Sequence, residues 1–112
     1  MVNEILKASG LEYAQGHFIR TPGGTYAVYF DDMTVSAADR VASAPRAGLP
    51  RILTHNVTVE LYEPKPDDAS AAALEAELDA RGLSWTKQDR FWIKEAQHYQ
   101  TVYEFTYTDK IP

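Results

Sequence analysis

Two segments of the chain alternate between a mainly apolar side and a mainly polar side. The segment 98–108, HYQTVYEFTYT, carries all of its phenylalanine and tyrosine residues on one side, and the segment 55–62, HNVTVELY, has the same two-residue period. Because successive side chains of a β-strand point to opposite faces of a sheet, each segment is predicted to be a strand with one face in the core. The expected inward-facing residues are His55, Val57, Val59 and Leu61 in one segment and Tyr99, Thr101, Tyr103, Phe105 and Tyr107 in the other.

A third segment, TYAVYF at 25–30, is apolar at nearly every position and is predicted to be an inner strand covered on both faces. The acidic pair at 31–32 is expected to end it. The sequence PGG at 22–24 predicts a hairpin turn rather than a phosphate-binding loop, because such a loop requires a helix after its glycines. Three covers for the second face of this strand stay open: the N-terminal helix, a neighbouring subunit and the loop at 36–51.

Apolar positions spaced by three and four residues predict one main helix after the prolines at 64 and 66. Ala71, Leu74 and Leu78 fall on one stripe of this helix. A short helix is also predicted at the N-terminus, where Val2, Ile5 and Leu6 form the inner face. The expected capping residues are Asn3 and Gly10 for the short helix, and Asp67 or Asp68 and Gly82 for the main one.

The elements together predict a single α+β domain over residues 1–112. A strand at 85–93, interrupted around 88–90, and a turn at 94–97 complete the order α-β-β-loop-β-α-β-β. This order indicates a mixed, mainly antiparallel sheet of four to five strands. The main helix is expected to pack on one face of the sheet, with Leu74 and Leu78 against the aromatic side of the last strand.

Charge and composition exclude several classes of function. Sixteen acidic and eleven basic residues give a formal net charge of −5. Nucleic-acid-binding proteins usually carry a basic excess, since phosphate neutralisation supplies most of their affinity, so the aromatic stripe is predicted to be core rather than a base-stacking surface. The chain has no cysteine, which excludes disulfides and thiolate catalysis. No apolar run approaches roughly 18 residues and no signal-peptide pattern is present, so a cytoplasmic protein is expected.

No pattern in the sequence indicates catalysis. His17, His55 and His98 lie far apart, and none is spaced with a carboxylate as metal ligands usually are. The sequence has neither a nucleophile-elbow motif nor a P-loop motif. We therefore predict a protein that is not an enzyme, with no catalytic residue, no cofactor and no bound metal.

The segment 36–51, SAADRVASAPRAGLPR, is the most unusual part of the sequence. It lacks a sustained period and carries more basic than acidic residues. A loop longer than about 12–15 residues in a compact domain is usually functional or disordered. We expect residues 38–51 to be mobile in the isolated subunit and ordered on assembly. The candidate assembly interface consists of Asp39, Arg40, Val41, Arg46, Leu49 and Arg51.

Four stretches of the chain, taken in order, resemble a known family. They are TYAVYFDD at 25–32, AAD at 37–39, VELYEPKPD at 59–67 and FWIKEAQHYQTVYEFTY at 91–107. Together they resemble the tail-terminator and tail-completion proteins of long-tailed bacteriophages and prophages, which are encoded among the head–tail connector and tail genes. The resemblance covers nearly the whole chain, and its motifs are packing motifs rather than catalytic ones. The family often has a proline just before the Tyr-x-Val-Tyr strand, where this chain has Gly24-Thr25.

The resemblance implies a structural virion protein. Members of this family form rings, commonly hexamers, that cap the finished tail tube and join it to the head. The implied partners are other copies of the chain, the tail tube and the head–tail connector proteins, with DNA only passing through the ring and no membrane contact. The implied location is the host bacterial cytoplasm during assembly and then the head–tail junction. Two alternatives stay open: another connector or minor tail protein, such as a stopper or adaptor, and an unrelated small α+β binding module.

Overall fold

The computed structural model describes residues 1–37, 51–66 and 68–111, which form two helices and a six-stranded mixed sheet. The fold is α+β, as predicted, but the sheet has more strands than expected and its order is β1-β2-β3-β6-β4, with β5 also paired to β6. The elements are α1 (Val2–Ala8), β1 (Glu12–Gln15), β2 (Tyr26–Ala37), β3 (Arg51–Glu63), α2 (Asp68–Ala80), β4 (Trp85–Lys87), β5 (Phe91–Ile93) and β6 (His98–Ile111).

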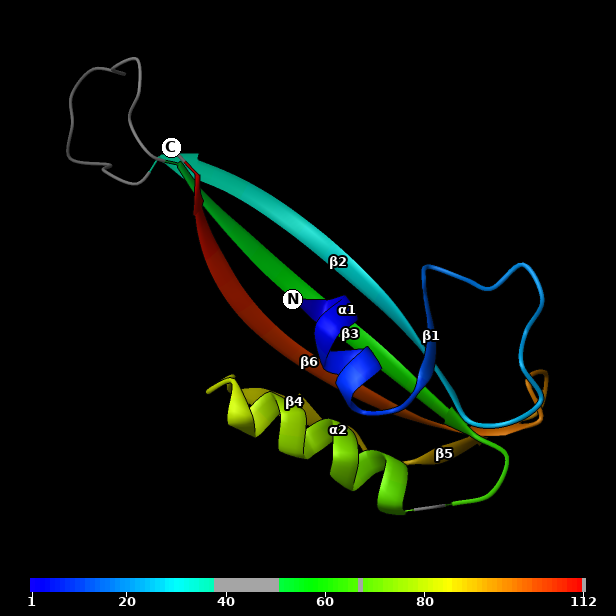
Figure 1. Ribbon diagram of the computed structural model, residues 1–112. Coiled ribbons are helices and arrows are strands. Elements are labelled where there is room, and N and C mark those ends of the chain that lie inside the picture. The colour runs from blue at the N-terminus through cyan, green and yellow to red at the C-terminus, as the bar shows by residue number, and fades with distance from the viewer. Residues whose placement is uncertain (38–50, 67, 112) are drawn as a thin grey trace.

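Three of the strands are much longer than the helices that pack on them. The 14 residues of β6 extend over about 46 Å at about 3.3 Å per residue, whereas the 13 residues of α2 span about 20 Å. In Figure 1, β2, β3 and β6 curve together away from α1 and α2. We call the helix-covered part the body. The remainder, formed by residues 32–37, 51–56 and 106–111 at matched levels of β2, β3 and β6, is called the arm.

The middle of the aromatic stripe of β6 lies in the core of the body, as predicted. Tyr103 and Phe105 are buried in one cluster with Leu74 and Leu78 of α2. Val57, Val59 and Leu61 of β3 belong to the same cluster, and so do Val2, Ile5 and Leu6 of α1. Burying each such side chain contributes about 1.5–3 kcal/mol, so this cluster fixes both helices on one face of the sheet.

The hairpin predicted at 22–24 is wrong. β1 pairs with β2 in parallel, so both strands run in the same direction. The crossing segment between them, residues 16–25, therefore has to return to the end of the sheet where β1 begins, instead of reversing tightly. Glycine and proline signal a change of direction, but they do not determine the orientation of the next strand. The crossing segment also packs on the far face of β2, where the Phe18 ring meets the Tyr26 ring edge-on at 5.4 Å. The far face at Tyr26 is therefore covered by a segment that was not among the three expected covers.

The acidic pair at 31–32 does not end β2, which continues to Ala37. Asp31 is accommodated inside the sheet because His55 of the neighbouring strand lies against its carboxylate. β3 begins at Arg51, so both ends of the segment predicted to be loop at 36–51 belong to strands. β6 likewise extends past its predicted end, to Ile111.

The helix ends agree with the glycine signals but not with the Asn3 cap. Gly10 and Gly82 have φ values of +76° and +69°, and the residue after each donates its N–H to a carbonyl of the last helical turn. Met1, not Asn3, is the N-cap of α1. Asn3 instead accepts a hydrogen bond of 2.7 Å from the Tyr29 hydroxyl. Asp68 is the first residue of α2, and residue 67 lies outside the described residues.

Candidate functional site: the three-stranded arm

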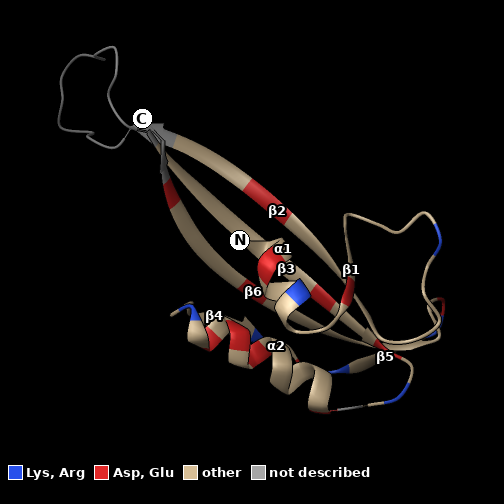
Figure 2. Ribbon diagram, in the orientation of Figure 1, with Lys and Arg blue, Asp and Glu red and all other residues tan. Residues whose placement is uncertain are grey.

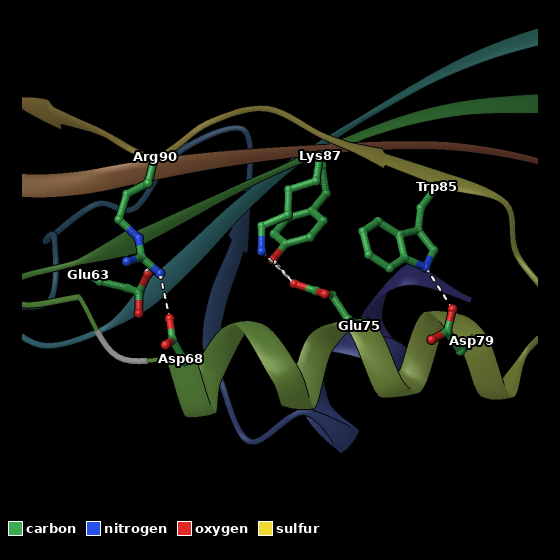
Figure 3. A network of polar contacts seen from close by, with 8 residues as sticks. Glu63, Asp68, Glu75, Asp79, Trp85, Lys87 and Arg90 are labelled. Atoms are coloured by element: carbon green, nitrogen blue, oxygen red, sulfur yellow. Dashed lines mark hydrogen bonds and ion pairs between the residues drawn. The ribbon is translucent and has the colours of Figure 1, made fainter.

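A network of polar contacts fixes α2 to the edge of the body (Figure 3). The Glu75 carboxylate accepts a hydrogen bond of 2.6 Å from the Tyr103 hydroxyl and lies 2.9 Å from Nζ of Lys87. Asp79, one helical turn further on, accepts a hydrogen bond of 2.8 Å from Nε1 of Trp85. Burial and the nearby Glu75 carboxylate both raise the pKa of Tyr103, so its hydroxyl stays protonated and continues to donate.

The same network holds the chain that leads from β3 into α2. Glu63 is fully buried, and Nε of Arg90 lies 3.6 Å from its carboxylate. Nη2 of Arg90 donates to Asp68, at the start of α2, over 3.2 Å. Each carboxylate in the network faces a cation, a hydroxyl or an indole N–H, which is the arrangement of a structural clamp. The helix is thereby held over the body and leaves the arm uncovered.

His55 sits where the body meets the arm and joins all three long strands. Its Nδ1 lies 2.9 Å from Oδ2 of Asp31 on β2, and its Nε2 lies 3.3 Å from Oδ2 of Asp109 on β6. Its ring stacks on Tyr107 with 4.2 Å between centroids. The sequence did not reveal this cluster, because its members are far apart in the chain and only the strand register brings them together.

Exposed apolar side chains mark the β2 side of the arm. Met33 and Val35 are 60% and 52% exposed, on the face that carries the helices further along the sheet. Phe30, at the base of the arm, is 41% exposed on the opposite face. Contiguous exposed apolar side chains are a feature of interaction surfaces, and Met33 and Val35 are such neighbours on one face of β2.

Both edges of the arm lack a neighbouring strand among the described residues. β1 accompanies β2 only as far as Tyr29, and β4 accompanies β6 only as far as Phe105. Beyond these points the outward-facing backbone groups of residues 30–37 and 106–111 have no strand partner in the described chain. Unpaired N–H and C=O groups along a strand edge are a template for pairing with another strand.

The face opposite the helices has an open hollow of about 450 Å³ beside the base of the arm. Its polar lining includes Asp32, Asn56, Glu104 and Thr106, and the Thr106 hydroxyl donates to the amide oxygen of Asn56 over 3.2 Å. Figure 2 shows acidic residues on each of the three long strands. The described residues also contain no group of three or more histidine and acidic side chains suited to a metal ion.

Most of the predicted assembly interface lies outside the residues that the structure describes. Asp39, Arg40, Val41, Arg46 and Leu49 lie outside the described residues, and Arg51 is the first residue of β3, at the tip of the arm. The prediction for these residues therefore stays a prediction. The arm itself was not predicted, because the strand of residues 25–30 was expected to end at the acidic pair 31–32 and residues 36–51 were expected to form a loop.

No protein-family model matches this chain, and no curated protein matches it. Neither helix of the described chain combines the length and apolar character that crossing a membrane requires.

Proposed function

We propose that this chain is a structural subunit of a tailed bacteriophage or prophage, acting in the tail-terminator or tail-completion ring at the head–tail junction. The observation that carries the proposal is the arm, whose two sides both have an unpaired strand edge and one of which also exposes apolar side chains. A subunit of a ring needs two different surfaces, one for each neighbour. The resemblance of VELYEPKPD and of the last strand to this family supports a role in a phage tail.

Two further properties suit this role. The polar clusters of the described chain are paired and structural, which fits an assembly subunit better than an enzyme. The net charge of −5 disfavours tight contact with DNA, as is appropriate for a ring through which DNA passes. The proposed partners are other copies of the chain, the tail tube and the connector proteins.

The proposal is tested in the phage or prophage that encodes this chain. Deleting its gene is expected to leave heads and tails unjoined, and supplying the intact chain is expected to restore joined particles. Electron microscopy of particles carrying a labelled chain should place the label at the head–tail junction. A label elsewhere on the particle would indicate the stopper, adaptor or minor tail alternatives. Normal particles without the gene, and no chain in purified virions, would overturn the proposal.

A further inference from the structure

We propose that the arm joins copies of this chain head to tail, with residues 30–37 of β2 in one copy pairing in parallel with residues 106–111 of β6 in the next. This inference names the surface through which the proposed ring closes, and to that extent it rests on the proposed function. The pairing itself is argued from the arm alone.

The two free edges are matched in position. Asp32, Asn56 and Thr106 stand at one level across the three strands, and Ala37, Arg51 and Ile111 stand at another. The edge of β2 is free from Phe30 and the edge of β6 from Thr106, and both remain free to the tip. Each copy thus offers two edges of similar length that begin and end at nearly the same height.

The two free edges also match in direction. β2 and β6 are both antiparallel to β3, so they run the same way and lie on opposite sides of the arm. When copies stand side by side with the same orientation, β6 of one copy meets β2 of the next as a parallel pair. Repeating this contact satisfies both edges of every copy, as a head-to-tail interface requires.

The shape of the subunit gives this repeat the rotation that a ring requires. The body is five strands wide, from β1 to β4, whereas the arm is three strands wide. Arms that pair edge to edge therefore force the wider bodies to splay outwards, and each copy is rotated relative to the last. A repeated contact with a constant rotation closes when the rotations add up to a full turn.

The β2 edge has few of the usual defences against pairing. Residues 30–37, FDDMTVSA, include no lysine, arginine, proline or glycine, and their register with β3 is continuous and has no bulge. Natural sheets protect exposed edges with such residues and bulges, because a long regular edge recruits other strands. The charges of this edge are confined to its base, where Asp31 is engaged by His55 and Asp32 is exposed.

A second arrangement, two β2 edges pairing antiparallel in a closed dimer, is less favoured. It satisfies the β2 edge of each copy but leaves both β6 edges unpaired. Head-to-tail pairing satisfies both edges with one kind of contact. The two arrangements predict different cross-links, so one experiment separates them.

Thr34, Thr54 and Thr108 provide the cross-linking experiment, because they stand at one level on β2, β3 and β6. The chain has no cysteine of its own. In one copy, positions 34 and 108 are two strands apart, about 9–10 Å, which exceeds the reach of a disulfide. The double variant Thr34→Cys with Thr108→Cys, oxidised at millimolar concentration or within phage particles, is expected to form a reducible ladder of dimers, trimers and larger species.

The single-cysteine variants decide between the arrangements. Neither Thr34→Cys nor Thr108→Cys alone is expected to form a cross-linked dimer, since each supplies only one of the two edges. A dimer from Thr34→Cys alone would show that β2 edges meet each other and would overturn the proposal. Monomer alone from the double variant, both in solution and in particles, would also overturn it.

A matched pair of lysine substitutions tests whether the edge itself is responsible. Asn56 and Thr106 are both exposed, share a level and a face, and share one hydrogen bond, but Asn56 is on the middle strand and Thr106 on the free edge. In the double-cysteine background, Thr106→Lys is expected to reduce the cross-linked fraction at least several-fold, and Asn56→Lys to leave it unchanged. Equal effects would contradict pairing at the edge. Circular dichroism and thermal unfolding of both variants verify that each is folded.

The outcomes also separate this inference from the proposed function. A ladder from a protein that is absent from virions would uphold the pairing and overturn the phage role. A protein located at the head–tail junction whose double variant stays monomeric there would uphold the phage role and overturn the pairing.

Discussion

The imidazole of His55 lies flat on the phenol ring of Tyr107, with ring centroids 4.2 Å apart and planes only 4° from parallel. The pair joins β3 to β6 at the base of the arm. The Asp31 carboxylate of β2 lies 2.9 Å from Nδ1 of the same imidazole, so all three long strands meet at His55. This cluster therefore links the base of the arm to the body, because Tyr107 also packs against the core.

Removing this cluster should weaken the fold measurably. His55→Ala deletes the ring stack and leaves the Asp31 carboxylate without its contact, so we expect the free energy of unfolding in urea to fall by about 1–3 kcal/mol. Tyr107→Phe keeps both rings and serves as the control, with an expected change below about 0.5 kcal/mol. An equally small effect of His55→Ala would mean that the strands are held at this point by their backbone alone.

The packing of α2 is tested by Leu78, which is fully buried beside Tyr103 and Phe105. Leu78→Ala should lower the free energy of unfolding by about 2–5 kcal/mol, because a cavity remains where the side chain was. Ala76→Ser, on the exposed side of the same helix, should cost no more than about 0.5 kcal/mol. A loss below about 1 kcal/mol for Leu78→Ala would show that the helix is not held by this contact.

The clamp between Arg90 and Glu63 is expected to behave as a charge pair with one buried member. Arg90→Met removes the guanidinium beside the buried Glu63 carboxylate and should destabilise the protein by about 1–3 kcal/mol, less than a fully buried pair because Arg90 is partly exposed. Adding Glu63→Gln should recover part of that loss, since a neutral amide needs no counter-charge.

The control for this pair is Asp68, whose side chain is almost fully exposed. Asp68→Asn removes the other negative charge beside the Arg90 guanidinium and should change the unfolding free energy by less than about 0.5 kcal/mol. No recovery in the double variant of Arg90 and Glu63 would argue that shape, rather than charge, is what Arg90 provides.

Alkaline pH should destabilise the fold through its buried tyrosines. The pKa of Tyr62 is raised to about 12: burial is the largest cause, the Glu60 carboxylate that accepts a hydrogen bond from the hydroxyl adds to it, and the hydrogen bond donated by Gln100 opposes it. Below pH 10, the usual pKa of a tyrosine, the folded and unfolded chains both keep this proton. The contribution of Tyr62 to the free energy of unfolding is therefore fully present there. From pH 10 to about 12 only the unfolded chain releases the proton, so the free energy of unfolding falls.

Phenolate absorbance and urea unfolding, followed together from pH 9 upwards, provide the measurement. Tyr62→Phe should flatten the decline between pH 10 and about 12, and Tyr99→Phe, at a half-buried position of β6, serves as the comparison. Identical pH profiles for the Tyr62→Phe variant and the unmodified chain would contradict this account.

Local patterns predicted most of the secondary structure because they report which face of each element is buried. The alternation at 55–62 and the stripe of Ala71, Leu74 and Leu78 both correspond to buried faces in the structure. The gap at 88–90 between β4 and β5 was also correct. Each of these signals lies within one element, where a single period determines the result.

Features that depend on how distant segments meet were not predicted. The parallel pairing of β1 with β2 depends on which edge of the sheet is free to accept β1, and the local sequence of β1 does not contain that information. The contact between Asp31 and His55 depends on a register between strands, and the same aspartate read alone indicates a strand end. The arm was missed for a related reason: its outer residues alternate too weakly between apolar and polar to distinguish an extended strand from a loop.

The continuous pairing of β3 with β6, from Arg51 opposite Ile111 to Glu63 opposite Tyr99, also determines how the arm carries mechanical load. Hydrogen bonds between antiparallel strands lie across the strand direction. A pull on the tip along the length of the arm therefore loads the whole ladder in shear, with every rung sharing the force, whereas a pull that peeled β6 sideways would break the rungs one at a time. The arm is stiff along its axis and weak across it, so tension applied at its tip reaches the body without first separating the strands.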